Sequence, residues 1–168
     1  MYAELYPPEL LEANICTMFS RLAAIACKYN IRIMIENEPI SRLLRDGNLL
    51  VDMLTRYDQV KLCLDLGRLH LQEKIDPSFN ALKFAETMAP YTCSIHLWNA
   101  SLNHPPFGGH YPALPELTPA DGWADIGALI EIIKESNCAV KVVFEHRSDL
   151  ISDQDLNRCY GWIAGMLK

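Results

Sequence analysis

Three features that the sequence lacks exclude whole classes of protein. Basic residues are not in excess, since 15 Lys and Arg stand against 21 Asp and Glu and the net charge is -6. Phosphate binding needs concentrated Lys and Arg, so we expect no nucleic-acid partner. No apolar run reaches the ~18 residues that a membrane span needs, so we expect no membrane partner either. The N-terminus lacks the basic start and apolar stretch of a signal peptide, which predicts a cytoplasmic location.

Paired cysteine motifs are also absent. The six cysteines stand singly on predicted helices and strands, and no C-x-x-C pair occurs. This favours reduced, buried thiols that serve as small hydrophobic side chains. Half of the 168 residues are apolar and 21% are charged, which is typical of a globular protein with a sizeable core. We therefore expect a single domain over residues 1–168.

The segment that organises the sequence is a strand that ends on a carboxylate. Residues 31–39 read IRIMIENEP, and Ile31, Ile33 and Ile35 have the period-2 spacing of a strand buried on one face. Glu36 lies on the opposite face, at the end of the apolar run. A carboxylate in this position costs free energy unless it meets a cation or a proton.

Three later segments repeat this arrangement. Residues 60–67, 91–99 and 139–147 read as strands that carry Asp65, His96 and Glu145 toward their ends. Each polar residue is expected to share its face with the residues two and four positions earlier. These pairs are Met34 and Arg32, Cys63 and Lys61, Ser94 and Thr92, and Val143 and Lys141.

Helical periodicity separates the strands. Helices are predicted from Pro7 to about Asn30, over residues 43–57, after Asp76-Pro77, after Asp125, and after a capping box formed by Ser152 and Asp155. The predicted inner face of the first helix is Leu11, Ile15, Met18, Leu22, Ile25 and Tyr29. A helix followed by four strand–helix units indicates an α/β fold with a parallel sheet and right-handed crossovers. Residues 99–124 are predicted to form a long, ordered loop, and loops of this length are usually functional.

The four polar residues at the strand ends are candidates for a metal site. In a parallel α/β fold, the working face lies at the carboxyl ends of the strands, where Glu36, Asp65, His96 and Glu145 are expected to converge. Three carboxylates and one imidazole suit a divalent ion such as Mn²⁺, Mg²⁺, Co²⁺ or Zn²⁺. Each residue alone could instead cap its strand or pair with a nearby Lys or Arg. Four in phase on successive strands favour the metal site.

The motifs IENEP, LDLG, IHLWN and VFEHR, with G-W-x-D-I before the penultimate helix, resemble the second half of the xylose isomerase-like (β/α)8 barrels. That group includes sugar-phosphate isomerases and epimerases, hydroxypyruvate isomerase, inosose dehydratase and nucleases of the endonuclease IV type. The resemblance covers nearly the whole chain and corresponds to strands five to eight of the barrel. It implies that Glu36, Asp65, His96 and Glu145 bind the metal, and that Glu36 and Glu145 also move the proton as acid and base.

Three further residues are candidates for substrate binding. Family members often have D-x-x-H after the sixth strand, whereas this chain has Arg68 at that position and His70 as the nearest histidine. Arg68 could bind a phosphate or carboxylate instead. His110 resembles a loop histidine that some relatives place at the rim of the site. The nuclease activity is disfavoured, because a multi-metal cluster needs more histidine and carboxylate ligands.

Several functions therefore stay open. The first is a divalent-metal-dependent isomerase or epimerase of a small sugar, sugar phosphate or related polyol. The second is a catalytically inactive half-barrel that serves as a binding or assembly module, and the third is a lyase of the inosose dehydratase kind. A complete barrel takes about 250 residues, so the chain is either a fragment of a barrel or a half-barrel. A four-stranded parallel sheet with two open edges predicts self-association, and hence a homo-oligomer.

Overall fold

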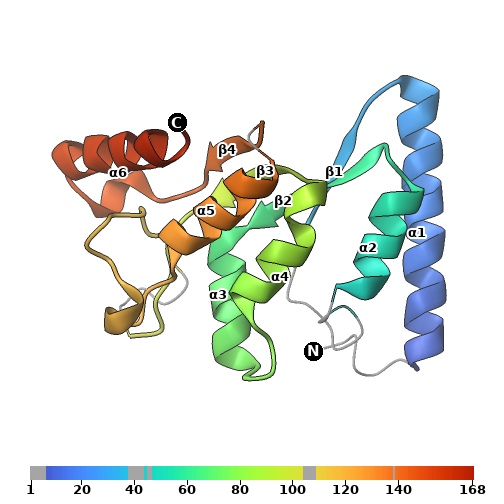
Figure 1. The fold of residues 1–168 in the computed structure, drawn as a ribbon, viewed down its shortest axis with the longest axis horizontal. Coiled ribbons are helices and arrows are strands. Elements are labelled where there is room, and N and C mark those ends of the chain that lie inside the picture. The colour runs from blue at the N-terminus through green and yellow to red at the C-terminus, as the bar shows by residue number, and fades with distance from the viewer. Residues whose placement is uncertain (1–6, 38–43, 45–46, 104–108, 138) are drawn as a thin grey trace.

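The computed structural model describes residues 7–37, 44, 47–103, 109–137 and 139–168 of the chain (Figure 1). Its strands are β1 (Ile33–Glu36), β2 (Val60–Asp65), β3 (Thr92–Leu97) and β4 (Lys141–Phe144). Its helices are α1 (Pro8–Tyr29), α2 (Asn48–Arg56), α3 (Leu66–Ile75), α4 (Ala81–Met88), α5 (Ile126–Ser136) and α6 (Asp153–Met166). Three short 3-10 helices, η3 (Ala89–Tyr91), η4 (Pro119–Asp121) and η5 (Ser148–Leu150), complete the described elements.

The four strands form one sheet in the order β1-β2-β3-β4, and every neighbouring pair is parallel. Helices lie between the strands in the sequence, so the predicted α/β fold of parallel units is confirmed. The register places Asp65 beside His96 at the carboxyl ends of β2 and β3. Beyond β4, the Glu145 amide donates a hydrogen bond to the Leu97 carbonyl, at 3.2 Å. The ladder thus extends to the last of the four polar residues.

The two faces of the sheet differ in what covers them. On one face, alternate residues such as Val60, Leu62 and Leu64 are fully buried in a core that the helices complete. On the other face, the side chains of Met34 and Val143 remain 50% and 47% exposed. The four polar residues of the candidate site stand at one end of this second face.

Several predicted helix boundaries are confirmed by their caps. The Asp125 carboxylate accepts a hydrogen bond from the Ala128 amide, at 3.1 Å, and begins α5. The Ser152 hydroxyl accepts a hydrogen bond from the Asp155 amide, at 3.2 Å, and begins α6. α2 begins at Asn48 after Gly47, whose φ of 78° suits glycine.

The predicted inner face of α1 is correct for Ile15, which is buried, and for Leu11 and Leu22, which pack against the core, but not for its other members. The structure buries Ile15, Phe19, Ala23 and Ala26, a stripe rotated from the predicted one. Met18, Ile25 and Tyr29, which were expected to face inward, are among the exposed large apolar side chains. Apolar residues occupy two sides of this helix, and periodicity alone does not choose between them.

α1 also corrects the expectation that no segment could span a membrane. This 22-residue helix is long and apolar enough to cross one, by length and composition only. Core helices and N-terminal signal sequences have the same properties, so the finding assigns no location.

The prediction missed α3 entirely. The chain enters this helix directly from β2, without a loop, and Asp65 is both the last strand residue and the N-cap. The segment LGRLHLQEKI lacks a clear apolar stripe because its first turns are buried on several sides, at Leu66, Gly67, Leu69 and His70. Asp76, which was expected to begin the next helix, instead follows the end of α3, and Asn80 caps α4.

A register shift in β3 corrects the predicted face of Thr92. Thr92 pairs with Leu62 and Ser94 pairs with Cys63, so Cys93 is an extra residue between them. The Thr92 side chain is fully buried and its hydroxyl donates to the Met88 carbonyl, at 2.9 Å. It therefore faces the helices, away from Ser94.

Two further corrections concern the single residues Ile31 and Cys27. Ile31 precedes β1 and is half exposed, so the buried isoleucine face is shorter than predicted. Among the cysteines that the structure describes, Cys63 and Cys159 are buried free thiols, as expected, whereas Cys27 is exposed.

Candidate metal centre

The structure brings all four predicted ligands together at the carboxyl edge of the sheet. Glu36 ends β1, Asp65 ends β2, His96 lies one residue before the end of β3, and Glu145 follows β4. One donor atom from each lies within 4.8 Å of the others. Donors that share an ion at about 2.0–2.2 Å are at most about 4.4 Å apart. Small side-chain movements would therefore bring the four-residue cluster to metal-binding distances.

His96 makes two close contacts with carboxylates inside the cluster. His96 Nδ1 lies 3.1 Å from Glu145 Oε2 and 3.5 Å from Glu36 Oε1. All three atoms are buried and have no hydrogen-bond partner among the described residues. Glu36 Oε1 has an ion pair with Arg68 Nε, at 3.1 Å, but buried polar atoms that lack a hydrogen bond are costly and call for an explanation. Convergence on one cation would satisfy all three, so this donor set fits a divalent metal ion.

Asp65 is the most deeply placed member of the cluster, and its side chain is fully buried. Its Oδ1 accepts the Arg68 amide hydrogen, at 2.9 Å, which caps α3. Asn37 holds the Asp65 backbone: its Oδ1 accepts the Asp65 amide at 2.6 Å, and its Nδ2 donates to the Asp65 carbonyl at 3.3 Å. This role of Asn37 was not predicted from the sequence. The available signal was a second polar residue directly after Glu36 in a segment that otherwise reads as buried.

Arg68 lies between two of the carboxylates. Its Nε is 3.1 Å from Glu36 Oε1 and 3.0 Å from Asp65 Oδ2. The predicted substrate residue is thus a direct neighbour of two predicted metal ligands. Burial raises the pKa of the Glu36 carboxyl, and the positive charges of Arg68 and His96 act in the opposite direction.

His110, the second predicted substrate residue, contacts the backbone at the Glu145 end of the site. Its Nδ1 lies 2.8 Å from the Glu145 carbonyl oxygen, and its own carbonyl accepts the Arg147 amide at 2.8 Å. The ring stacks on Trp98 with a centroid distance of 4.0 Å and an interplanar angle of 2°. Trp98 in turn lies against Gly67, where a Cβ atom would come within 2.4 Å of the indole. The glycine of LDLG therefore makes room for the aromatic support of His110.

The described parts of the predicted loop, residues 99–103 and 109–124, fold back on themselves beside the site. Asn99 and Tyr111 form an antiparallel bridge, and Ser101 bridges Trp123 in the same way. The Asn99 carboxamide oxygen also accepts the amides of Ala100 and Ala124, at 2.8 and 3.1 Å. Residues 104–108 lie outside the described part of the chain. The predicted order of this loop holds for its two described stretches.

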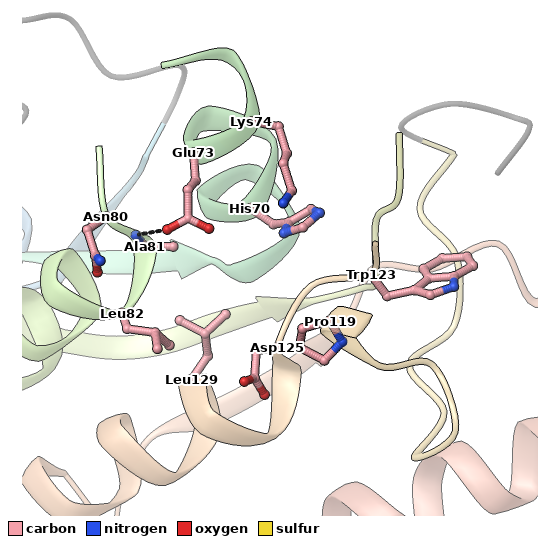
Figure 2. A pocket seen from close by; sticks show the side chains of 10 residues that line it. All are labelled: His70, Glu73, Lys74, Asn80, Ala81, Leu82, Pro119, Trp123, Asp125 and Leu129. Carbon is pink, nitrogen blue, oxygen red and sulfur yellow. Dashed lines mark hydrogen bonds between the residues drawn. The ribbon is translucent and has the colours of Figure 1, made fainter. Parts of the chain in front are cut away.

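His70, the third predicted substrate residue, lines a separate pocket of about 200 Å³ whose lining includes none of the four cluster residues (Figure 2). The pocket lies between α3, the start of α4 and the start of α5. His70 is 5% exposed and hydrogen-bonds the Gly122 backbone, which links α3 to the segment before α5. Burial lowers the pKa of this imidazole.

No protein-family model matches the chain, and neither does any curated protein.

Proposed function

We propose that the protein is a divalent-metal-dependent isomerase or epimerase of a small sugar, sugar phosphate or related polyol. The observation that carries this proposal is the convergence of three carboxylates and one imidazole within 4.8 Å at the carboxyl ends of four parallel strands. This donor set suits Mn²⁺, Mg²⁺, Co²⁺ or Zn²⁺. The strand-end motifs that resemble the second half of xylose isomerase-like barrels support the same assignment.

The proposed reaction is proton transfer next to a carbonyl. A bound divalent cation would polarise the carbonyl and make the neighbouring C–H acidic. Glu36 and Glu145 flank His96 from β1 and from the end of β4, which suits one carboxylate to remove the proton and the other to return it. The partly buried position of Glu36, which raises its pKa, brings this carboxyl closer to the range where it can exchange protons near neutral pH.

Two further residues are assigned to the substrate. Arg68 would bind an anionic group, because its planar guanidinium matches phosphate and carboxylate geometry. His110 would contact the substrate beside Glu145, where the Trp98 stack and the Glu145 carbonyl hold its ring. His70 is not part of this proposed substrate site, because it lines the separate pocket.

Metal analysis of the purified protein, followed by exchange measurements, tests the proposal. We expect about one divalent ion per chain, and loss of most of it in Glu36→Gln and Glu145→Gln. We also expect the wild type to exchange the C–H hydrogen next to the carbonyl of a small ketose or ketose phosphate with D₂O, as followed by NMR. Glu116→Gln, which removes an exposed carboxylate paired with Arg158, is the matched control and should keep both properties. Unchanged metal content in both cluster variants would refute the ligand assignment.

One observation favours a second candidate function, that of a non-catalytic binding or assembly module. The face of the sheet opposite the helix-covered core, the inner face, exposes Met34 and Val143. A partner could cover these side chains. Metal binding without hydrogen exchange for any of the sugars tested would favour this function over the isomerase.

A further inference from the structure

Arg68 occupies an unusual position for a substrate-binding residue. Its Nε is almost equally close to Glu36 Oε1, at 3.1 Å, and Asp65 Oδ2, at 3.0 Å. These two carboxylates come from neighbouring strands and are two of the four candidate ligands. The guanidinium therefore supplies positive charge where a cation bound by the cluster would supply it.

The backbone of Arg68 is held in place, and its side chain is partly exposed. The Arg68 amide donates to Asp65 Oδ1, at 2.9 Å, in the first turn of α3, so the Cα position is tied to the N-cap. The side chain is 29% exposed, whereas that of Asp65 is fully buried.

The positive charge of Arg68 has opposite effects on the cluster with and without a bound cation. Without a cation, Glu36 and Asp65 would repel each other, and the guanidinium offsets that repulsion. With a divalent ion in the cluster, the same guanidinium is a like charge a few ångströms from the ion. At that distance the repulsion is large enough to change cation affinity by about a factor of ten, even with strong solvent screening.

We propose that Arg68 is an internal counter-cation of the cluster, which holds Glu36 and Asp65 together in the metal-free protein and competes with the divalent ion for them. The inference rests on the proposed metal-dependent function. When the ion is bound, Arg68 leaves the carboxylates and becomes available to an oxyanion, the phosphate or carboxylate group of a ligand. Metal and anion should then bind cooperatively, and each should strengthen the other by the same factor.

Mn²⁺ affinity of the full chain tests the competition, with free Mn²⁺ measured by electron paramagnetic resonance. We expect Arg68→Met, which keeps an apolar stem and removes the charge, to bind Mn²⁺ about tenfold more tightly than the wild type. Arg68→Lys keeps the charge and should stay within about threefold of the wild type. Arg158→Met is the matched control, because it removes an arginine paired with Glu116 and Asp155 and lying outside the cluster. It should change the affinity by less than twofold.

The same titration with sulfate as the oxyanion probe tests the second half of the proposal. We expect sulfate to tighten Mn²⁺ binding by the wild type severalfold and to have no effect on Arg68→Met. Thermal unfolding adds a measurement that needs no titration. Metal-free Arg68→Met should melt below the wild type, because Glu36 and Asp65 are then unbalanced, and saturating Mn²⁺ should raise its Tm by more than it raises that of the wild type.

The outcomes separate this inference from the proposed function. Mn²⁺ binding by the wild type, together with equal or weaker binding by Arg68→Met, would overturn the counter-cation role and leave the metal-dependent function standing. No Mn²⁺ binding by either protein would overturn both. If Arg68→Met does not fold even with Mn²⁺, the sulfate effect on the wild type decides: its presence there and in Arg68→Lys, which keeps the charge, supports the inference, and its absence from the wild type overturns it.

Discussion

Asp65 has two separate tasks, which its two oxygen atoms divide. Oδ1 caps α3 through the Arg68 amide, and Oδ2 contacts the Arg68 Nε inside the cluster. A carboxamide can perform the first task but carries no charge for the second. Substitution can therefore separate the structural role of this residue from its proposed role in cation binding.

We expect Asp65→Asn to retain the helix cap and Asp65→Ala to lose it. The alanine variant should be less stable than the asparagine variant by about 1 kcal/mol, the usual cost of a lost N-cap. Both variants should lose most of the bound metal. Urea unfolding together with metal analysis measures the two effects. Equal stability of the two variants would show that the cap contributes nothing here.

Gly67 has only a hydrogen atom in place of a side chain. This leaves room for the Trp98 ring, which supports His110 at the site. A Cβ at this position would lie 2.4 Å from the Trp98 indole, which no small adjustment of a rigid ring relieves. Gly161, in the middle of α6, has nothing within 4 Å of such a Cβ. The two glycines form a matched pair, because both are helical and only one is crowded.

Gly67→Ala is expected to destabilise the protein by about 1–3 kcal/mol, the usual cost of overpacking a buried site. Gly161→Ala should be neutral or should stabilise the protein by up to about 1 kcal/mol, because alanine favours a helix interior. Urea unfolding followed by tryptophan fluorescence measures both. A Gly67→Ala protein as stable as the wild type would mean that the Trp98–His110 stack can shift at no cost.

At the scale of elements, α3 links the four-residue cluster to the pocket that His70 lines. Sequence patterns did not predict this connection. It begins on Asp65, carries Arg68 into the cluster, and presents His70 to the pocket and to the Gly122 backbone. Gly122 itself has a φ of 85° and ends η4, so the imidazole fastens a tight turn to the helix. The helix thus joins the edge that carries the candidate metal centre to the segment that precedes α5.

The lowered pKa of His70 predicts how stability depends on pH. Above about pH 6.5, the ordinary pKa, the imidazole is neutral in both the folded and unfolded chains and contributes no pH dependence. As the pH falls below 6.5, the unfolded chain takes up a proton that the folded chain resists, so stability falls until the pH reaches the lowered folded pKa. We expect the wild type to lose stability in this window and His70→Gln to lose less.

Urea unfolding at several pH values between 5 and 7.5 measures this slope. His146, whose pKa burial also lowers, should contribute part of it, so the double variant with His146→Gln is expected to be the flattest. A slope that is identical in His70→Gln and the wild type would mean that His70 is protonated in the folded protein or that its burial is relieved by local opening.

At the scale of the whole molecule, two exposed apolar surfaces compete as contact sites. One is the inner face of the sheet, with Met34 and Val143, where Ser94 and Met34 meet across the strands at 3.2 Å. The other is the outward stripe of α1, with Leu10, Met18 and Ile25. Parallel sheets are rarely bare on either face, so we expect the inner face to be the one that a second copy covers. A two-fold pair would then imitate a closed barrel.

Light scattering at micromolar concentration tests this expectation. The wild type should form a dimer, Met34→Glu should shift it toward the monomer, and Met18→Glu should leave the dimer intact. Both substitutions place a charge at a position that is already half exposed, so neither should unfold the chain. A monomeric wild type contradicts the expectation, and loss of the dimer only in Met18→Glu would assign the contact to α1.

The residues of the candidate centre could be predicted because their signal is local. Alternation along each strand defines a face, and parallel strands bring their carboxyl ends to one edge, so Glu36, Asp65, His96 and Glu145 needed no knowledge of the packing. The helix caps at Asp125 and Ser152 were predictable for the same reason, since a cap depends on residues within one turn.

Only the tertiary structure decided the features that depend on what a segment packs against. The buried side of α1, the helix that follows Asp65 at once, and the bulge that turns Thr92 toward the helices all reflect contacts between distant segments. The place of Arg68 between two carboxylates belongs with them, because it needs β1 and β2 in register and α3 started at the strand end. Sequence periodicity reports which residues share a face, whereas the neighbour of that face is set by close packing, and packing is a property of the whole chain.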